Sequence, residues 1–153
     1  MTLRAPAPRW RHPDPDGPML TISATEVDQA FDFPGLVETL REAFRDGAVS
    51  PVRHHHMIDR PQGSASTLLL MPAWTDFLNN GTSDGFTGIK IVTVSPDNNA
   101  IGKPAVMGVY LLTDGRTGEP LALIDGQRLT LWRTAAASAL VRMSSGRFMA
   151  ASA

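Results

Sequence analysis

The sequence has no cysteine, and this absence removes several kinds of chemistry. A disulfide framework, a zinc site with thiolate ligands and a cysteine nucleophile are all excluded. The sequence also lacks an excess of either charge. Its 153 residues include 14 Lys and Arg and 15 Asp and Glu, which gives a net charge of −1. Proteins that bind nucleic acid or anionic membranes usually carry a basic excess or stripe. We therefore expect neither partner.

Long hydrophobic runs are also missing. The longest, Thr67 to Trp74 and Val106 to Leu112, are far shorter than the roughly 20 residues that cross a bilayer. The N-terminal segment carries Arg and Pro but no apolar stretch of the kind that a secretory signal needs. These features predict a cytoplasmic protein without a membrane span. The length and the 42% hydrophobic content suit one globular domain.

The two ends of the chain differ in pattern from its middle. Residues 1–18 contain five prolines and no apolar periodicity, so they cannot bury enough surface to offset the entropy lost on ordering. We expect a disordered arm there, with Met19 as an alternative translation start. Residues 19–143 form a patterned domain. Residues 144–153 are small and unpatterned, and we expect them to form a disordered tail.

Helix and strand signals follow one another through the patterned domain. Residues 23–26 have the S-x-x-E form of a capping box, and Asp32 can cap a second helix that stops at Gly47. The expected strands cover 52–58, 66–71, 89–95, 106–113 and 121–125. Thr130 then caps a last helix over 131–143. This order predicts an α+β domain with a largely antiparallel or mixed sheet and flanking helices.

A run of three histidines, His54 to His56, raises the question of a metal site. Neighbouring side chains of a strand point to opposite faces, so three adjacent imidazoles cannot converge on one ion. One or two imidazoles hydrogen-bonded inside the sheet explain the run better. No H-E-x-x-H, G-x-S-x-G, P-loop or G-x-G-x-x-G pattern occurs. We expect no metal, and zinc protease, serine hydrolase and P-loop assignments lack support.

Three cations occupy positions that need an explanation. Lys90 shares a strand face with Val92 and Val94, and a buried ammonium is costly unless it is paired; a charge that protects an edge strand explains it equally well. Arg133 falls in the first turn of the last expected helix, where the helix dipole disfavours a cation unless an anion is near. Arg53 alone suits an exposed surface position. Together the three make a candidate site for a carboxylate or a small phosphate.

Several short segments are informative because of the order in which they follow one another along the chain. They are Met71–Ala73, Gly88–Val92, Gly108–Asp114, Thr117–Ala122, Asp125–Gly126 and Arg133–Ala139. No single segment is specific, but the ordered set, over about residues 19–140, resembles the ornithine cyclodeaminase/mu-crystallin family. The resemblance implies a substrate-binding and dimerisation domain. In that family a Rossmann domain that binds NAD follows the helix expected here at Thr130.

The resemblance also implies roles for the three cations. Arg53 and Lys90 match the family's arginine and lysine that bind the substrate carboxylate. Arg133 matches the arginine of an R-T-A-A helix that contacts cofactor or substrate at the junction between the domains. The family reaction converts L-ornithine to L-proline and ammonia with NAD. Ketimine reductases and alanine dehydrogenases are related, and a homodimer with an amino-acid substrate is implied.

The chain departs from the family pattern in three places. Ala105 stands where some members carry a hydroxyl that contacts the cofactor, and the loop from Thr75 to Gly88 is longer than in some relatives. After Leu140 no strand and glycine-rich turn follow, so we expect a truncated protein that lacks the Rossmann domain and the acid/base residue. Such a chain would not hold NAD stably, would be inactive alone and would expose apolar residues around Trp132 and Leu140. The alternative is a non-catalytic module for ligand binding or dimerisation.

Overall fold

The computed structural model describes residues 17–150, with side chains described as far as residue 143. The expected arm over residues 1–18 falls almost entirely outside this range. The elements are β1 (Leu20–Ile22), α1 (Ala24–Ala30), α2 (Phe33–Asp46), β2 (Ala48–Val49), β3 (His54–Ile58), β4 (Ser66–Thr75), α3 (Phe77–Asn80), β5 (Phe86–Val94), a 3-10 helix (Pro96–Ile101), β6 (Val106–Asp114), β7 (Pro120–Asp125) and α4 (Gly126–Ala150).

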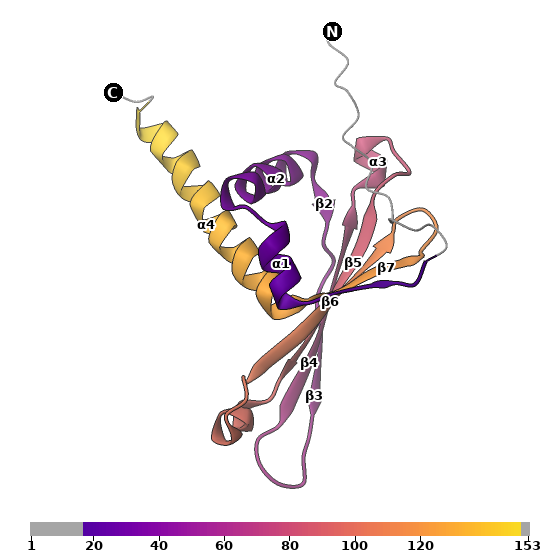
Figure 1. Cartoon of the computed structure of the whole chain (residues 1–153), viewed down its shortest axis with the longest axis vertical. Coiled ribbons are helices and arrows are strands. Elements are labelled where there is room, and N and C mark those ends of the chain that lie inside the picture. The colour runs from indigo at the N-terminus through magenta and orange to yellow at the C-terminus, as the bar shows by residue number, and fades with distance from the viewer. Residues whose placement is uncertain (1–16, 151–153) are drawn as a thin grey trace.

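A seven-stranded sheet forms the centre of the molecule (Figure 1). Its order is β1-β7-β6-β5-β4-β2, and β3 also pairs with β4. All neighbouring strands are antiparallel except β1 and β7, which run parallel. Figure 1 shows α1, α2 and α4 beside the upper part of the sheet, while the β3–β4 hairpin and the 3-10 helix project below them. The predicted α+β class with a mostly antiparallel sheet is confirmed.

The first two helices begin and end at the predicted residues. At α1 the backbone N–H of Ser23 donates to Glu26 Oε2 at 2.8 Å, and the Ser23 hydroxyl accepts from the backbone N–H of Glu26 at 3.4 Å, which completes a capping box. At α2 the Asp32 carboxylate accepts from the backbone N–H of Gly35 at 2.8 Å. Gly47, with φ of 81°, ends α2 in a conformation that favours glycine. Local capping chemistry therefore sets both helices.

The last helix starts earlier than predicted. Asp125 caps α4, because its Oδ1 accepts from the backbone N–H of Arg128 at 2.7 Å. Thr130 lies inside α4, where its hydroxyl donates to the carbonyl of Gly126, so its assignment as the cap was wrong. Arg133 consequently lies in the third turn of α4, beyond the reach of the dipole at the helix start. The helix dipole therefore gives no reason to expect an anion near Arg133.

The other end of α4 also differs from the prediction. The helix continues through Ala150, so residues 144–150 are helical where a disordered tail was expected. Arg147, Met149 and Ala150 are good helix formers, and one interior glycine, Gly146, weakens a helix by about 1 kcal/mol without ending it. Residues 151–153 lie outside the described part of the chain.

Packing of α4 on α2 makes the main apolar cluster. Val37, Ala136 and Leu140 are 6%, 0% and 8% exposed and form its centre. The half-buried Trp132 packs edge-on against Phe31, with ring centroids 5.9 Å apart. Trp132 and Leu140 themselves are covered by α1 and α2, whereas their neighbours Leu131 and Val141 are 60% and 65% exposed, so the expected exposure of apolar residues is confirmed for these neighbours only.

Four short elements were not predicted, namely β1, β2, α3 and the 3-10 helix. In the loop after β4, Asp76 accepts from the backbone N–H of Asn79 at 3.2 Å and starts the single turn α3. The 3-10 helix replaces a simple turn after β5. Strand β5 begins at Phe86, three residues before the predicted start. In the described part of the chain, none of the helices combines the length and apolar character that a membrane span requires.

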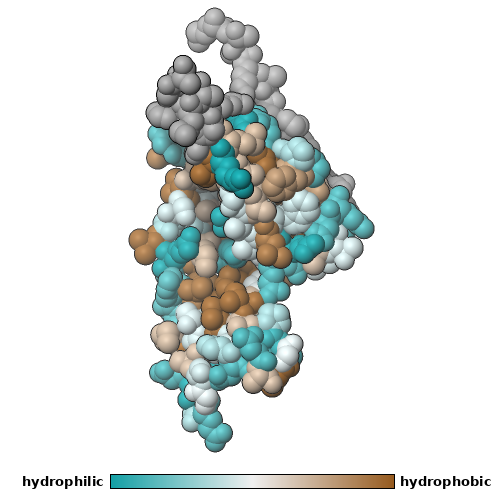
Figure 2. Space-filling model, turned by 90° about the vertical axis from the view of Figure 1, so that its left-hand side faces the viewer, coloured by the Kyte–Doolittle hydropathy of each residue, from teal (hydrophilic) through white to brown (hydrophobic). Residues whose placement is uncertain are grey.

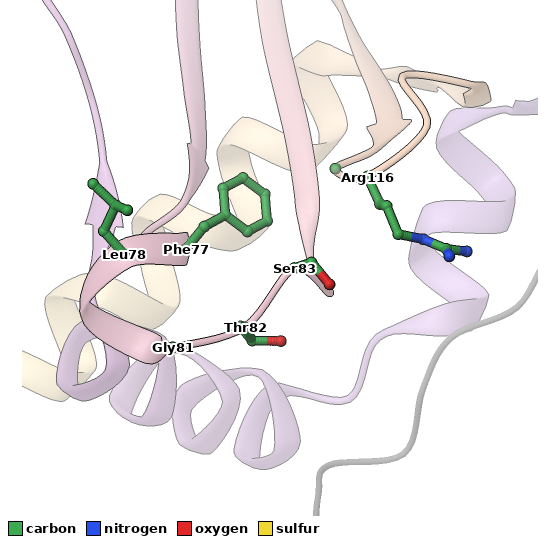
Figure 3. A pocket seen from close by; sticks show the side chains of 7 residues that line it. Phe77, Leu78, Gly81, Thr82, Ser83 and Arg116 are labelled. Atoms are coloured by element: carbon green, nitrogen blue, oxygen red, sulfur yellow. The ribbon is translucent and has the colours of Figure 1, made fainter.

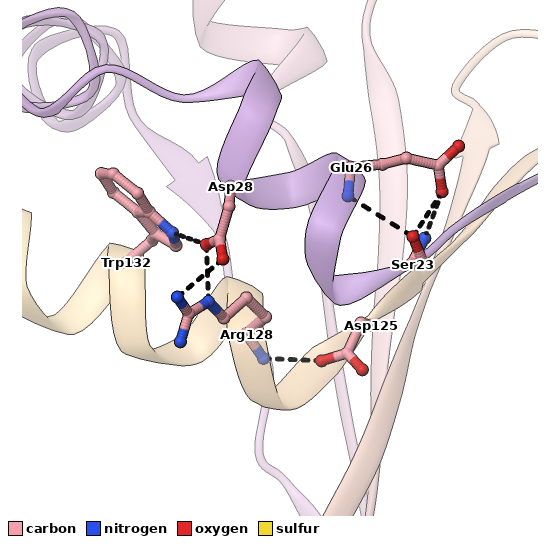
Figure 4. Close-up of polar contacts among 6 residues, drawn as sticks. All are labelled: Ser23, Glu26, Asp28, Asp125, Arg128 and Trp132. Carbon is pink, nitrogen blue, oxygen red and sulfur yellow. Dashed lines mark hydrogen bonds and ion pairs between the residues drawn. The ribbon is translucent and has the colours of Figure 1, made fainter.

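A cluster of polar side chains fastens α1 to the start of α4 (Figure 4). Arg128 donates from Nε to Asp28 Oδ1 at 2.5 Å and from Nη2 to Asp28 Oδ2 at 2.7 Å. Trp132 Nε1 donates to the same Oδ1 at 2.7 Å. The hydrogen bonds from Arg128, and next those from Trp132, hold the pKa of Asp28 below its usual value. This Asp28 cluster joins helices far apart in sequence and fixes where α4 lies.

Replacing Asp28 with Asn should lower stability at neutral pH and reduce its dependence on acid. Because the folded-state pKa of Asp28 is lowered, its charge stabilises the fold above the unfolded value of about 3.9. That contribution is lost as pH falls through the lower folded value. In urea unfolding, the difference between wild type and Asp28→Asn should be wide at about pH 7 and narrower at about pH 3.

Glu38→Gln is the matched control for this prediction. Its partner is Arg41 on the same exposed helix face, with Arg41 Nη1 2.8 Å from Glu38 Oε2. An exposed pair of this kind contributes little, so the control should unfold almost as the wild type does. A difference for Asp28→Asn that is equally wide at both pH values would contradict the assigned role of the carboxylate charge.

Candidate carboxylate-binding site

Lys90 lies at the centre of the sheet. Its strand, β5, pairs with β4 on one side and β6 on the other, so Lys90 is not on an edge strand. This overturns the explanation of Lys90 as a charge that protects an edge. Directly opposite it lie Met71 on β4 and Tyr110 on β6. The same face of β5 carries the buried residues Gly88 and Val92. Lys90 is half-buried among apolar neighbours, so its ammonium needs another explanation.

The structure brings the three predicted cations together. Burial is the largest cause that lowers the pKa of Lys90, and the positive charges of Arg133 and then Arg53 lower it further. No carboxylate contributes to this shift. Arg53 immediately precedes β3, and Arg133 extends from α4; both are exposed. Among the described residues, Lys90, Arg53 and Arg133 therefore form a cation cluster in which no carboxylate acts on Lys90.

Two glycines determine how closely α4 approaches the sheet. A Cβ on Gly126 would lie 2.8 Å from the carbonyl oxygen of Gly108. A Cβ on Gly108, which pairs with Val92, would lie 2.6 Å from the carbonyl oxygen of Ile91. The side chain of Gln127 donates to the carbonyl of Val106 and fixes the same junction. The absence of a side chain at Gly126 lets the backbone of α4 rest on β6, and the absence of one at Gly108 avoids a collision with β5.

Tyr110 is a further residue of this region, and the sequence analysis did not single it out. It lies opposite Lys90 on the same face, and a Cβ on Gly88 would come within 1.9 Å of its hydroxyl oxygen. Burial raises the pKa of the Tyr110 phenol, so it stays protonated at neutral pH. The signal that identifies it is the strand register, which a single sequence does not give.

The histidine run points outward. His54 and His56 share one face, with ring centroids 6.4 Å apart and an angle of 14° between the rings, and His55 faces the other way. All three are exposed, so the expected imidazole inside the sheet was wrong. Among the described residues, no group of three or more histidine, aspartate or glutamate side chains gathers as a metal site would.

An open hollow of about 530 Å³ lies elsewhere, between the α3 segment and the β6–β7 turn (Figure 3). Phe77, Leu78, Gly81, Thr82, Ser83, Gly115 and Arg116 line it. Figure 3 shows the Arg116 side chain extending away from the Phe77 ring. None of the three clustered cations takes part in this hollow, so it is separate from the candidate site.

Comparisons with known proteins agree with the fold and the motifs. The family model for the ornithine cyclodeaminase/mu-crystallin family matches residues 18–151. A Δ1-pyrroline-2-carboxylate reductase of Bacillus cereus is 36% identical over 124 residues, which cover 78% of this chain and 35% of the relative. The chain therefore spans about a third of the length of such curated relatives.

Solved structures show the same likeness. The Δ1-pyrroline-2-carboxylate reductase of Thermococcus litoralis, in complex with NADH and L-proline, has a TM-score of 0.63 at 27% identity, over 78% of this chain and 36% of that one. An archaeal alanine dehydrogenase dimer with bound NAD has a TM-score of 0.60 at 28% identity, over 78% and 34%. The chain belongs to the ornithine cyclodeaminase/mu-crystallin family.

Proposed function

We propose that this chain is the carboxylate-binding part of an NAD-linked reductase or dehydrogenase that acts on amino or imino acids. The observation that carries the proposal is the cation cluster, which brings two guanidinium groups near a half-buried ammonium without a carboxylate at Lys90. A compact anion relieves the repulsion among these charges. The B. cereus and T. litoralis relatives support a substrate of the pyrroline-2-carboxylate and proline type.

Each cation has a distinct role in this proposal. Arg53 and Lys90 bind the α-carboxylate, because a planar guanidinium can grip both oxygens while an ammonium adds a concentrated charge. Arg133 extends from α4, and we assign it contact with the cofactor or the substrate. The half-buried position of Lys90 strengthens its attraction to an anion, since the surroundings are less polar than water.

We propose that binding of NAD belongs to the whole protein and not to the residues of this chain alone. A bound pyrophosphate usually lies at a helix N-terminus behind a glycine-rich turn. Within the described residues, strand β7 runs directly into α4 without a glycine-rich turn, and the Asp125 carboxylate caps the helix start where a phosphate would bind. The residues present therefore do not fit NAD as a complete site. We derive no hydride-transfer step from them.

Ornithine cyclodeamination is the second candidate, because it is the reaction that gives the family its name. L-Ornithine carries a side-chain ammonium in addition to its α-carboxylate. The charges around Lys90 are positive and would repel that ammonium unless a carboxylate from outside the described residues balanced it. A cyclic imino acid carries no such second ammonium. The cation cluster therefore favours the imino-acid class.

Calorimetric titration of the 153-residue chain with L-proline tests the proposal. We expect binding with Kd on the order of millimolar, and no binding of L-prolinamide, which keeps the ring but lacks the negative charge. Absence of L-proline binding would contradict the proposed function. Affinity for L-ornithine equal to or above that for L-proline would favour the cyclodeaminase alternative.

A homodimer is proposed as the assembly. Figure 2 shows apolar side chains gathered on the surface below the helices, and Met57 and Val106 are 68% and 51% exposed. Exposed apolar side chains that gather on one surface are typical of an interface. The archaeal alanine dehydrogenase supports this assembly, since it is described as a dimer. Light scattering during size-exclusion chromatography of the calorimetry sample would contradict the homodimer if it showed only monomer.

A further inference from the structure

Tyr110 and Lys90 present two hydrogen-bond donors side by side. They are register partners on β6 and β5 and share one face of the sheet. Directly opposite residues have Cβ atoms about 5 Å apart. In the described part of the chain, no group accepts a hydrogen bond from the half-buried Tyr110 hydroxyl. No carboxylate of these residues contributes to the pKa shift of Lys90. Buried polar groups nearly always have a hydrogen-bond partner, from protein or from water, so a donor turned inward favours a ligand acceptor.

Gly88 determines where the Tyr110 hydroxyl lies. A Cβ on Gly88 would come within 1.9 Å of Oη, 2.5 Å of Cζ and 2.9 Å of Cε1 of Tyr110. An aromatic ring is rigid, so any other residue at position 88 would push the whole ring aside. Gly88 is itself buried. The hydroxyl is therefore held against the strand that carries Lys90, two residues away.

We propose that Tyr110 is a substrate-binding residue whose hydroxyl donates a hydrogen bond to the same carboxylate that Lys90 binds. This inference rests on the proposed function and deepens it, because it adds a neutral donor to the cation cluster. A carboxylate offers about four acceptor positions, so it can accept from Tyr110 and from the cations together. The ligand class is an amino or imino acid with its carboxylate directed at β5 and β6.

A spectroscopic test can use the fact that Tyr110 is the only tyrosine of the chain. Protein labelled with 3-fluorotyrosine should give one ¹⁹F resonance, and this resonance reports on position 110 alone. We expect it to move when L-proline is added and to stay in place when L-prolinamide is added. The same titration on Lys90→Met should leave the resonance unmoved, because the carboxylate is no longer held beside the phenol.

A second test measures affinity. Tyr110→Phe removes only the hydroxyl, and it should weaken L-proline binding about tenfold, which is the usual effect of losing one hydrogen bond to a charged group. Thr93→Val is the matched control, since it removes an exposed hydroxyl from the opposite face of β5. Its affinity should equal that of the wild type.

Gly88→Ala gives an independent check, because it should displace the ring and weaken binding as Tyr110→Phe does. If Gly88→Ala fails to fold, Tyr110→Phe decides the matter alone. L-Proline binding that is equally strong in wild type and Tyr110→Phe, with an unmoved ¹⁹F resonance, would overturn the role of Tyr110 and leave the proposed function intact. A wild-type chain that does not bind L-proline would overturn both.

Discussion

Lys90→Met should remove most of the affinity of the chain for L-proline. Methionine keeps the apolar stem and deletes the charge, so a carboxylate loses its only half-buried cationic partner in the cluster. Removing one side of a buried charge pair costs about 2–5 kcal/mol, and the lower end applies because Lys90 is only half-buried. The dissociation constant should therefore rise by at least about 30-fold. Calorimetric titration with L-proline measures it.

Lys103→Met is the matched control, because Lys103 is the other lysine of the chain and lies exposed after the 3-10 helix. It should bind L-proline as the wild type does. Equal losses in both variants would point to a general effect of net charge, and unchanged binding in Lys90→Met would exclude the cation cluster as the site.

The stability of Lys90→Met should move in the opposite direction from its affinity. The folded-state pKa of Lys90 is lowered, so the folded chain disfavours the protonated form that predominates at neutral pH. Deleting the charge removes repulsion from Arg133 and Arg53, and the variant should be at least as stable as the wild type. A loss of binding therefore cannot be attributed to unfolding.

Leu140→Ala should be the most destabilising of the changes considered. Leu140 is 8% exposed between α2 and α4, and its truncation leaves a cavity beside Val37 and Ala136. Substitutions of this kind cost about 2–5 kcal/mol, against a total stability of roughly 5–15 kcal/mol for a domain. The midpoint of urea unfolding should fall clearly, with little change in slope.

Leu131→Ala provides the comparison within the same helix. Leu131 is 60% exposed, so its truncation should change the free energy of unfolding by no more than about 0.5 kcal/mol. Both substitutions place the same residue type in α4, so helix propensity cancels between them. Equal destabilisation by the two would mean that α4 does not pack on α2 through Leu140.

Much of the fold follows from local sequence signals. The capping box at Ser23, the cap at Asp32 and the stop at Gly47 act within a few residues, and all three were predicted correctly. The start of α4 was not, since Asp125 and Thr130 are both plausible caps. The choice depends on the contact of Gly126 with β6, which joins residues distant in sequence. Local patterns cannot contain that information.

The candidate site also has features that the sequence predicts and features that depend on strand order and register. The cost of burying Lys90, together with the family resemblance, identified the three cations, and the structure brings them together although the dipole argument for Arg133 was wrong. Whether Lys90 lies on an edge or a central strand depends on strand order, which the sequence left open. Tyr110 was missed because its relation to Lys90 exists only in the cross-strand register.

Because α4 is long, a small change in its direction moves its far end by a large distance. A continuous helix over residues 126–150 is about 37 Å long. Gly126 rests on Gly108 at its start, and the hydrogen bonds of Arg128 and Trp132 with Asp28 hold its first two turns. A change of ~10° in the direction of α4 at Gly126 would displace its far end by ~6 Å and Arg133 by only ~2 Å. A side chain at position 126, which would collide with the backbone of Gly108, would therefore displace the far end of α4 much more than the cation cluster.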